Sequence, residues 1–223
     1  MRKTGLYIAP FVAALMAFGA VAQAAVISED VSYWYWLQDQ SIATVFNPDS
    51  VWLQANLGYL IIKVQQTVYD LEQSAQILER DGQTPPAAGY LYAYSVTNLN
   101  WDDGLTGFKV DWGVESLFTT VSKRVTPSGW NVNLLSSTPD WYYSPTSDYG
   151  IAPGETVGGF WALASTGEDR VVSASAASIT AGGIEVPYWI AGQTTGPVPD
   201  PAPITTMLMG LSGLGLTRLL RRR

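Results

Sequence analysis

The sequence predicts an all-β fold, an antiparallel β-sandwich formed by residues 25–195. Short segments rich in β-branched and aromatic residues recur along this body, and clusters of Gly, Pro, Asn and Asp separate them at the spacing typical of sandwiches. The segment 89–99 (GYLYAYSVTNL) alternates between two registers, as a strand with two different faces does. The body is long enough for one domain with a sizeable core. The expected strands are residues 31–37, 57–69, 89–99, 108–114, 117–125, 130–135, 157–164, 170–180 and 184–190.

The first 24 residues predict an export signal. A basic pair opens the chain, residues 6–21 are almost entirely apolar or small, and Ala22 and Ala24 occupy the small-residue positions of a cleavage site. This is the pattern of a secretory signal peptide, so we expect cleavage after Ala24 and a mature chain that begins at Ala25. The apolar run is also nearly long enough to span a bilayer, which makes an uncleaved N-terminal anchor the alternative.

Residues 57–80 allow two interpretations. Apolar side chains from Ile61 to Leu78 recur at helical spacing and form an amphipathic stripe. The first half of the segment is also rich in β-branched residues and alternates apolar with polar positions, which indicates a half-buried strand. We favour a strand over 57–69, then a loop or short helix over 70–80, and a loop over 81–88.

The end of the chain predicts a linker and then a membrane helix. Four of the residues 196–203 are Pro, which lacks the N–H and fixes φ, so this stretch should be an extended linker. The apolar segment from Ile204 to Leu220, within 204–223, is at the helical rise slightly shorter than a bilayer core. A buried C-terminal helix of an ordinary domain is the alternative. The arginines expected to hold the end of the span on the cytoplasmic side are Arg218, Arg221, Arg222 and Arg223.

Three consecutive features of this tail carry a family resemblance. The motif Val198-Pro199-Asp200-Pro201, the apolar segment and the arginine cluster together resemble the PEP-CTERM sorting signal of Gram-negative bacteria, with Asp200 standing where that family usually has Glu. The resemblance implies processing by an exosortase-type membrane enzyme while the apolar segment holds the chain transiently in the inner membrane. It also implies delivery to the cell envelope, the outer surface or the extracellular matrix.

The body carries a second resemblance. Residues 90–98 (YLYAYSVTN) are similar to a strand of exported β-sandwich domains that bear this signal. Gly129, Trp130, Trp141 and the segment 151–160 (IAPGETVGGF) follow in a similar order. This resemblance implies an immunoglobulin-like sandwich and no assigned activity.

Charge and missing residue types exclude several classes of function. Outside the two terminal signals the chain keeps six basic and 18 acidic residues, so the net charge of the body is 6 − 18 = −12. Such a body repels nucleic acid and anionic membrane surfaces. The chain has no Cys and no His, which excludes disulfides, thiol nucleophiles, Ser-His-Asp triads and His-ligated zinc. Paired carboxylates could still form a glycosidase, but no pair stands out, and we expect neither enzymatic activity nor a cofactor.

The carboxylate cluster Asp102, Asp103, Asp111 and Glu115 is the best place to look for a cation. Asn98, Asn100 and Asp102 have the spacing of the first ligands of an EF-hand loop. Asp103 then stands where that loop needs Gly, and Lys109 stands where it needs Glu. An Asx-rich turn between two strands explains the same residues, so we predict no metal site and keep Asp102 and Asp103 as the candidates for one.

Two aromatic clusters, residues 33–36 (YWYW) and 141–143 (WYY), point to a further function. Flat rings with polar rims suit stacking on sugar rings in a wet groove. The competing interpretation is that these tryptophans form the core. We therefore expect a non-enzymatic exported protein of the surface or extracellular matrix, and the alternative is a carbohydrate- or Ca²⁺-binding module of the exopolysaccharide matrix. The candidate stacking residues are Trp34, Trp36, Trp141 and Tyr143.

Overall fold

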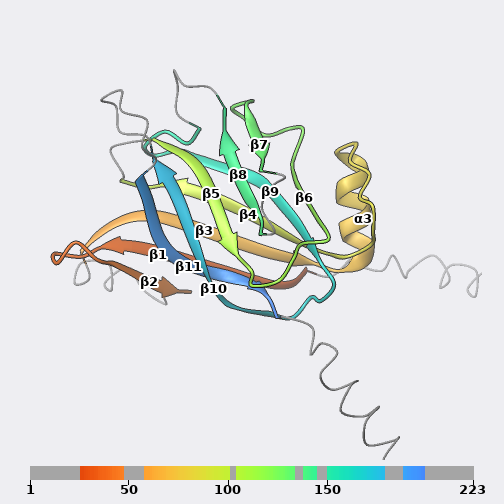
Figure 1. Ribbon diagram of the computed structural model, residues 1–223, viewed down its shortest axis with the longest axis horizontal. Helices are drawn as coiled ribbons and strands as arrows, with labels where there is room; N and C mark the ends of the chain where they lie inside the picture. Colours follow the sequence, from red (N-terminus) through yellow and green to blue (C-terminus); the bar gives the residue numbers. More distant parts are fainter. Residues whose placement is uncertain are drawn as a thin grey trace, which may run out of the picture.

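Two antiparallel sheets form the body of the protein (Figure 1). The computed structural model describes residues 26–47, 58–100, 104–133, 138–144, 150–178 and 188–198. Sheet A has the order β2 (Ile42–Phe46), β1 (Val26–Trp36), β3 (Tyr59–Tyr69), β4 (Tyr90–Asn98), β9 (Thr156–Ala164) and β6 (Phe118–Val121). Sheet B has the order β11 (Tyr188–Pro197), β10 (Asp169–Ser178), β5 (Leu105–Asp111), β8 (Asp140–Tyr143) and β7 (Trp130–Val132). Every pair of neighbouring strands is antiparallel, and the predicted all-β class is confirmed.

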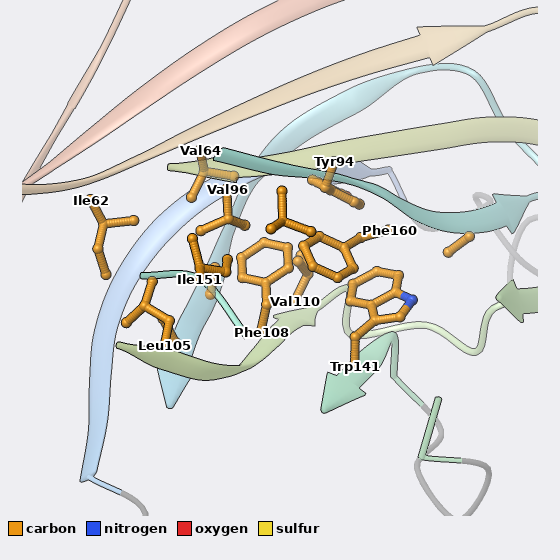
Figure 2. Packing of buried hydrophobic residues seen from close by; sticks show 14 of the residues in the cluster. Ile62, Val64, Tyr94, Val96, Leu105, Phe108, Val110, Trp141, Ile151 and Phe160 are labelled. Atoms are coloured by element: carbon orange, nitrogen blue, oxygen red, sulfur yellow. The ribbon is translucent and has the colours of Figure 1, made fainter. Parts of the chain in front are cut away.

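An aromatic core fills the space between the two sheets (Figure 2). Tyr94 and Phe160 come from sheet A, and Phe108 and Trp141 come from sheet B. The rings of Phe108 and Trp141 stack with centroids 5.7 Å apart, and Tyr94 meets Phe108 edge-on at 5.8 Å. Such pairs add to the free energy gained by removing these large rings from water. The two sheets therefore face each other across one common core.

The period-two pattern of β4 is confirmed by its burial. Tyr92, Tyr94 and Val96 belong to the core between the sheets. Leu91, in the other register, packs against a separate small cluster on the outer face of sheet A. The alternation in the sequence therefore separates the core between the sheets from the outer face of sheet A, where Leu91 is covered by the small cluster.

The ambiguous segment 57–80 is a strand followed by a helix, as favoured above. β3 runs to Tyr69, and Asp70 then caps the helix α3 (Leu71–Arg80) by accepting a hydrogen bond from the Gln73 backbone N–H at 2.8 Å. An Asp at this position satisfies one of the N–H groups that lack a partner within the helix. Leu78 packs on Leu91 and Leu163, so α3 covers part of the outer face of sheet A.

Several predicted boundaries are wrong. The strands β2 and β8 were not expected, and the strand predicted over 117–125 shortens to β6. The linker predicted from residue 196 begins inside β11, because Gly196 and Pro197 pair with Arg170 and Asp169 of β10. β11 lies at the edge of sheet B, where a residue without an N–H is tolerated.

Among the described residues, no helix combines the length and the apolar character needed to cross a bilayer. The predicted export signal, the residues after Val198 with their proposed membrane segment, and the pair Asp102 and Asp103 lie outside the described ranges.

Candidate functional site

The burial of Trp34 and Trp141 contradicts the stacking role predicted for them. Both side chains are 0% exposed, and Tyr143 is 9% exposed, whereas Trp36 is half-buried and packs against the core. The Trp34 Nε1–H donates to the Gln193 carbonyl oxygen at 2.9 Å, and the Trp141 Nε1–H donates to the Thr120 carbonyl oxygen at 2.8 Å. These rings tie the two sheets together and present no free face to a sugar.

Other aromatic side chains are exposed instead. Trp189 and Tyr142 are 44% and 45% exposed, and both belong to sheet B. Their chain neighbours Ile190 and Trp141 point into the core. Because successive side chains of a strand point to opposite faces, Trp189 and Tyr142 stand on the outer face of sheet B.

Strand register brings these two aromatic residues into one row. Trp189 pairs with Ala177, Ala177 with Gly107, Gly107 with Tyr142, and Tyr142 with Asn131. We call these five residues the platform row. It crosses all five strands of sheet B, with small residues in the middle and a ring on each side. At the usual spacing between strands, the Cα atoms of Trp189 and Tyr142 are roughly 14 Å apart.

The indole of Trp189 extends along the sheet. A Cβ built on Gly107 would lie 3.7 Å from Cη2 of Trp189 and 2.9 Å from Cβ of Ala177. The tip of the indole therefore reaches over Ala177 as far as Gly107, two strands away from its own backbone. Small residues at these two positions leave room for the ring, and its exposed part faces solvent.

A row of polar residues lies beside the platform row. Ser175 pairs with Lys109, and Lys109 pairs with Asp140, all in the outward register of their strands. We call these three residues the polar row. Within the described part of the chain, neither the Lys109 ammonium nor the Ser175 hydroxyl has a hydrogen-bond or ion-pair partner. The Asp140 carboxylate accepts a hydrogen bond from Asn133 Nδ2 at 3.1 Å. The outer face thus offers donors and an oriented acceptor next to flat rings.

An open cavity of about 750 Å³ lies elsewhere, where β1 begins and β11 ends. Hydrogen bonds in and beside this cavity hold the β9–β10 connection and the start of β10: the Ser28 hydroxyl donates to the Asp169 carboxylate at 2.5 Å, and the Tyr92 hydroxyl donates to the Glu168 carbonyl oxygen at 2.9 Å. Burial, with the charges of Asp169 and Glu168, raises the pKa of Tyr92 far above its usual value, so this hydroxyl stays a donor. The described residues include no group of three or more acidic side chains that could hold a metal ion.

Sequence reasoning missed both exposed rings of the platform row. Tyr142 lies between Trp141 and Tyr143 in the chain. The prediction put Trp141 and Tyr143 on the exposed face of this strand, whereas the structure buries both and exposes Tyr142. Trp189 stands apart from both aromatic clusters. Alternation alone would have found Tyr142 once Trp141 was assigned to the core.

Comparisons with protein-family models, with curated proteins and with solved structures find no match to this chain. The functional assignment therefore rests on the residues of the chain and on the geometry of sheet B.

Proposed function

We propose that this protein is an exported, non-enzymatic component of the cell envelope or extracellular matrix that binds polysaccharide on the outer face of sheet B. The observation that carries the binding role is the platform row, in which Trp189 and Tyr142 flank the small residues Ala177 and Gly107. An aromatic face packs against the C–H groups of a sugar ring, while hydroxyl groups at the ring's edge need hydrogen-bond partners. The polar row supplies such partners on the same face.

The proposed route of the protein rests on its two terminal segments. The sorting motif Val198-Pro199-Asp200-Pro201 follows directly on β11, and an exosortase-type enzyme is the proposed processing partner. Ile27 and Val198 line the same cavity, so the body begins and ends at one end of the molecule. This arrangement suits a body that both signals place above one membrane before the N-terminal signal is cleaved. The resemblance of residues 90–98 supports the immunoglobulin-like variant of the sandwich.

The binding role is tested by truncating the rings of the platform row. Trp189→Ala and Tyr142→Ala should each lower the affinity for the exopolysaccharide of the native host by about tenfold or more, because a central aromatic contact contributes about 1.4–2 kcal/mol or more. Affinity electrophoresis or co-sedimentation measures the change. Tyr59→Ala is the matched control, since Tyr59 is 78% exposed and lies on sheet A. If all three variants bound the polysaccharide with equal affinity, the platform row would not be the binding site.

The sorting role is tested by the intact mass of the protein recovered from the medium and from the inner membrane of the native host. We expect a released species that begins at Ala25 and ends at or beyond Val198, because residues up to Pro197 belong to β11. Recovery of only the full C-terminal tail in the inner membrane would show a membrane-anchored envelope protein instead.

A further inference from the structure

We infer that the ligand of the platform row is a neutral polysaccharide, bound along the interior of its chain rather than at a chain end. This inference rests on the proposed polysaccharide-binding function and names the class of glycan. Three features carry it: the shape of the row, the charge of the face, and the free polar groups beside the rings.

The shape of the row favours the interior of a chain. The row runs from the β11 edge of sheet B to the β7 edge, and its two rings are each nearly half exposed. Recognition of a chain end needs a concave pocket that surrounds the terminal sugar. The cavity described above is lined by other residues, from β1, β4, the β9–β10 connection and Val198. A row that crosses the whole sheet instead contacts one side of a chain that continues past both edges.

The charge of the face favours a neutral ligand. No member of the platform row is charged, and in the polar row Lys109 stands directly across from Asp140. An anionic polysaccharide would need a cluster of basic side chains to offset repulsion by a body whose net charge is −12. Lys109 is the single cation among the described residues of the platform and polar rows.

Three of the basic side chains elsewhere are engaged away from this face. Arg124 lies 3.9 Å from the Asp81 carboxylate, and Arg170 Nη2 donates to the Trp112 carbonyl oxygen at 3.1 Å. Lys123 donates from Nζ to the Gly82 carbonyl oxygen at 2.5 Å. These contacts leave Lys109 to act as an isolated hydrogen-bond donor rather than as part of an anion site.

The polar row supplies hydrogen-bond partners for the hydroxyl groups at the edge of a bound sugar ring. Residues two apart on a strand are about 7 Å apart, so Lys109 stands about 7 Å from Gly107 on the same face. A sugar ring stacked on the Trp189 indole, which extends over Ala177 as far as Gly107, therefore has its hydroxyl edge within reach of the flexible Lys109 ammonium and of the Ser175 hydroxyl. Both groups lack protein partners among the described residues, so binding a sugar hydroxyl breaks no bond within the protein.

The decisive experiment measures binding of the full chain to matched panels of neutral and acidic polysaccharides, at low and at high salt. We expect a neutral polysaccharide to bind with little dependence on salt, and oligosaccharides cut from it to compete better as they lengthen, until one spans both Trp189 and Tyr142. Lys109→Met should weaken binding about fivefold, the loss expected for one hydrogen bond of about 1 kcal/mol. Lys63→Met, on the outer face of sheet A, is the control and should leave binding unchanged.

The outcomes separate this inference from the proposed function. Tighter binding of an acidic polysaccharide that salt abolishes, or competition by a single sugar as strong as by a long oligosaccharide, would overturn the neutral, chain-interior assignment. In either case, sensitivity to Trp189→Ala would leave the binding role standing. Failure of every polysaccharide, including that of the native host, to bind the wild-type protein would overturn both.

Discussion

Two buried tyrosines of β4 show how single residues join the sheets. The Tyr94 hydroxyl donates to the Thr195 carbonyl oxygen at 3.0 Å and accepts from the Trp112 Nε1–H at 2.9 Å. The Tyr92 hydroxyl donates to the Glu168 carbonyl oxygen at 2.9 Å. Both are 1% exposed or less, and burial raises the pKa of each above its usual value, further helped at Tyr92 by Asp169 and Glu168. These hydroxyls must therefore stay protonated in the folded protein.

This requirement predicts a loss of stability in alkali. In the unfolded chain a tyrosine ionises near its ordinary pKa of about 10, whereas in the folded chain Tyr92 and Tyr94 resist ionisation. The contribution of these two tyrosines to the free energy of unfolding should not change with pH below about pH 10, and it should fall above that pH. The fall should approach about 1.4 kcal/mol per pH unit for each tyrosine. Denaturant titrations at a series of pH values measure the slope.

Matched variants assign the slope to these residues. Tyr94→Phe should reduce the alkaline slope, and at neutral pH it should lower the free energy of unfolding by about 1–3 kcal/mol, because the Trp112 N–H loses its buried partner. Tyr59→Phe, at a ring 78% exposed, should change neither quantity. An unchanged alkaline slope in a Tyr92→Phe, Tyr94→Phe double variant would contradict the explanation.

At the scale of the element, α3 is held on sheet A by polar contacts at both ends. Near its start, the Ser74 hydroxyl donates to the Asp70 carbonyl oxygen at 2.6 Å and accepts from the Leu91 backbone N–H at 2.8 Å. At its end, the Asp81 carboxylate accepts from the Ser122 hydroxyl and from the Lys123 backbone N–H, each at 2.8 Å. Between these contacts the apolar cluster around Leu78 excludes water.

The contact at the end of the helix should be costly to lose. Asp81 is 7% exposed, so Asp81→Ala leaves the Ser122 hydroxyl and the Lys123 N–H without an acceptor and should lower the free energy of unfolding by about 2–3 kcal/mol. Glu79→Ala, on the exposed side of the same helix, should change it by about 0.5 kcal/mol or less. Urea unfolding compares the two. Equal stability of both variants would show that Asp81 does not anchor the helix.

At the scale of the whole molecule, β11 closes the space between the sheets. The Gln193 carbonyl oxygen accepts from Trp34, the Gln193 N–H donates to the Thr44 hydroxyl at 3.1 Å, and the Thr195 hydroxyl donates to Gln66 Oε1 at 2.8 Å. A Cβ on Gly192 would lie 2.3 Å from the Trp34 ring, so only Gly lets the backbone approach this indole. The strand that bears Trp189 is thus bound to both sheets.

This position links the proposed binding face to the proposed sorting tail. Trp189 stands at the start of β11, and Pro197 and the sorting motif stand at its end. The platform row therefore lies toward the end of the sandwich opposite the one where the body begins and finishes. A body held by its tail would present the row away from the point of attachment.

Local patterns predicted the central strands well and the short ones poorly. The alternation in residues 90–98 identifies β4, because a strand with period two needs no information from the rest of the chain. The strand β8 has four residues, too few for a periodic pattern, and it forms because β5 and β7 pair with it on either side. The strand in 57–69 was separable from a helix only through its β-branched residues and its alternation of apolar with polar positions.

The roles of the aromatic residues could not be predicted in the same way. In the segments 33–36 and 141–143 both registers of the strand are aromatic, so composition does not say which register is buried. Burial follows from the sheet that covers each face, and that is a long-range property. The stacking candidates were accordingly placed on core residues such as Trp34 and Trp141.

The sequence by itself determined the all-β class, the strongly acidic body and the exclusion of Cys and His chemistry, because these follow from composition and local periodicity. Only the tertiary structure decided that Trp189 and Tyr142, far apart in the chain, share one row. That row depends on the registers of β11 with β10, β10 with β5 and β5 with β8, which are set by packing across the whole sandwich.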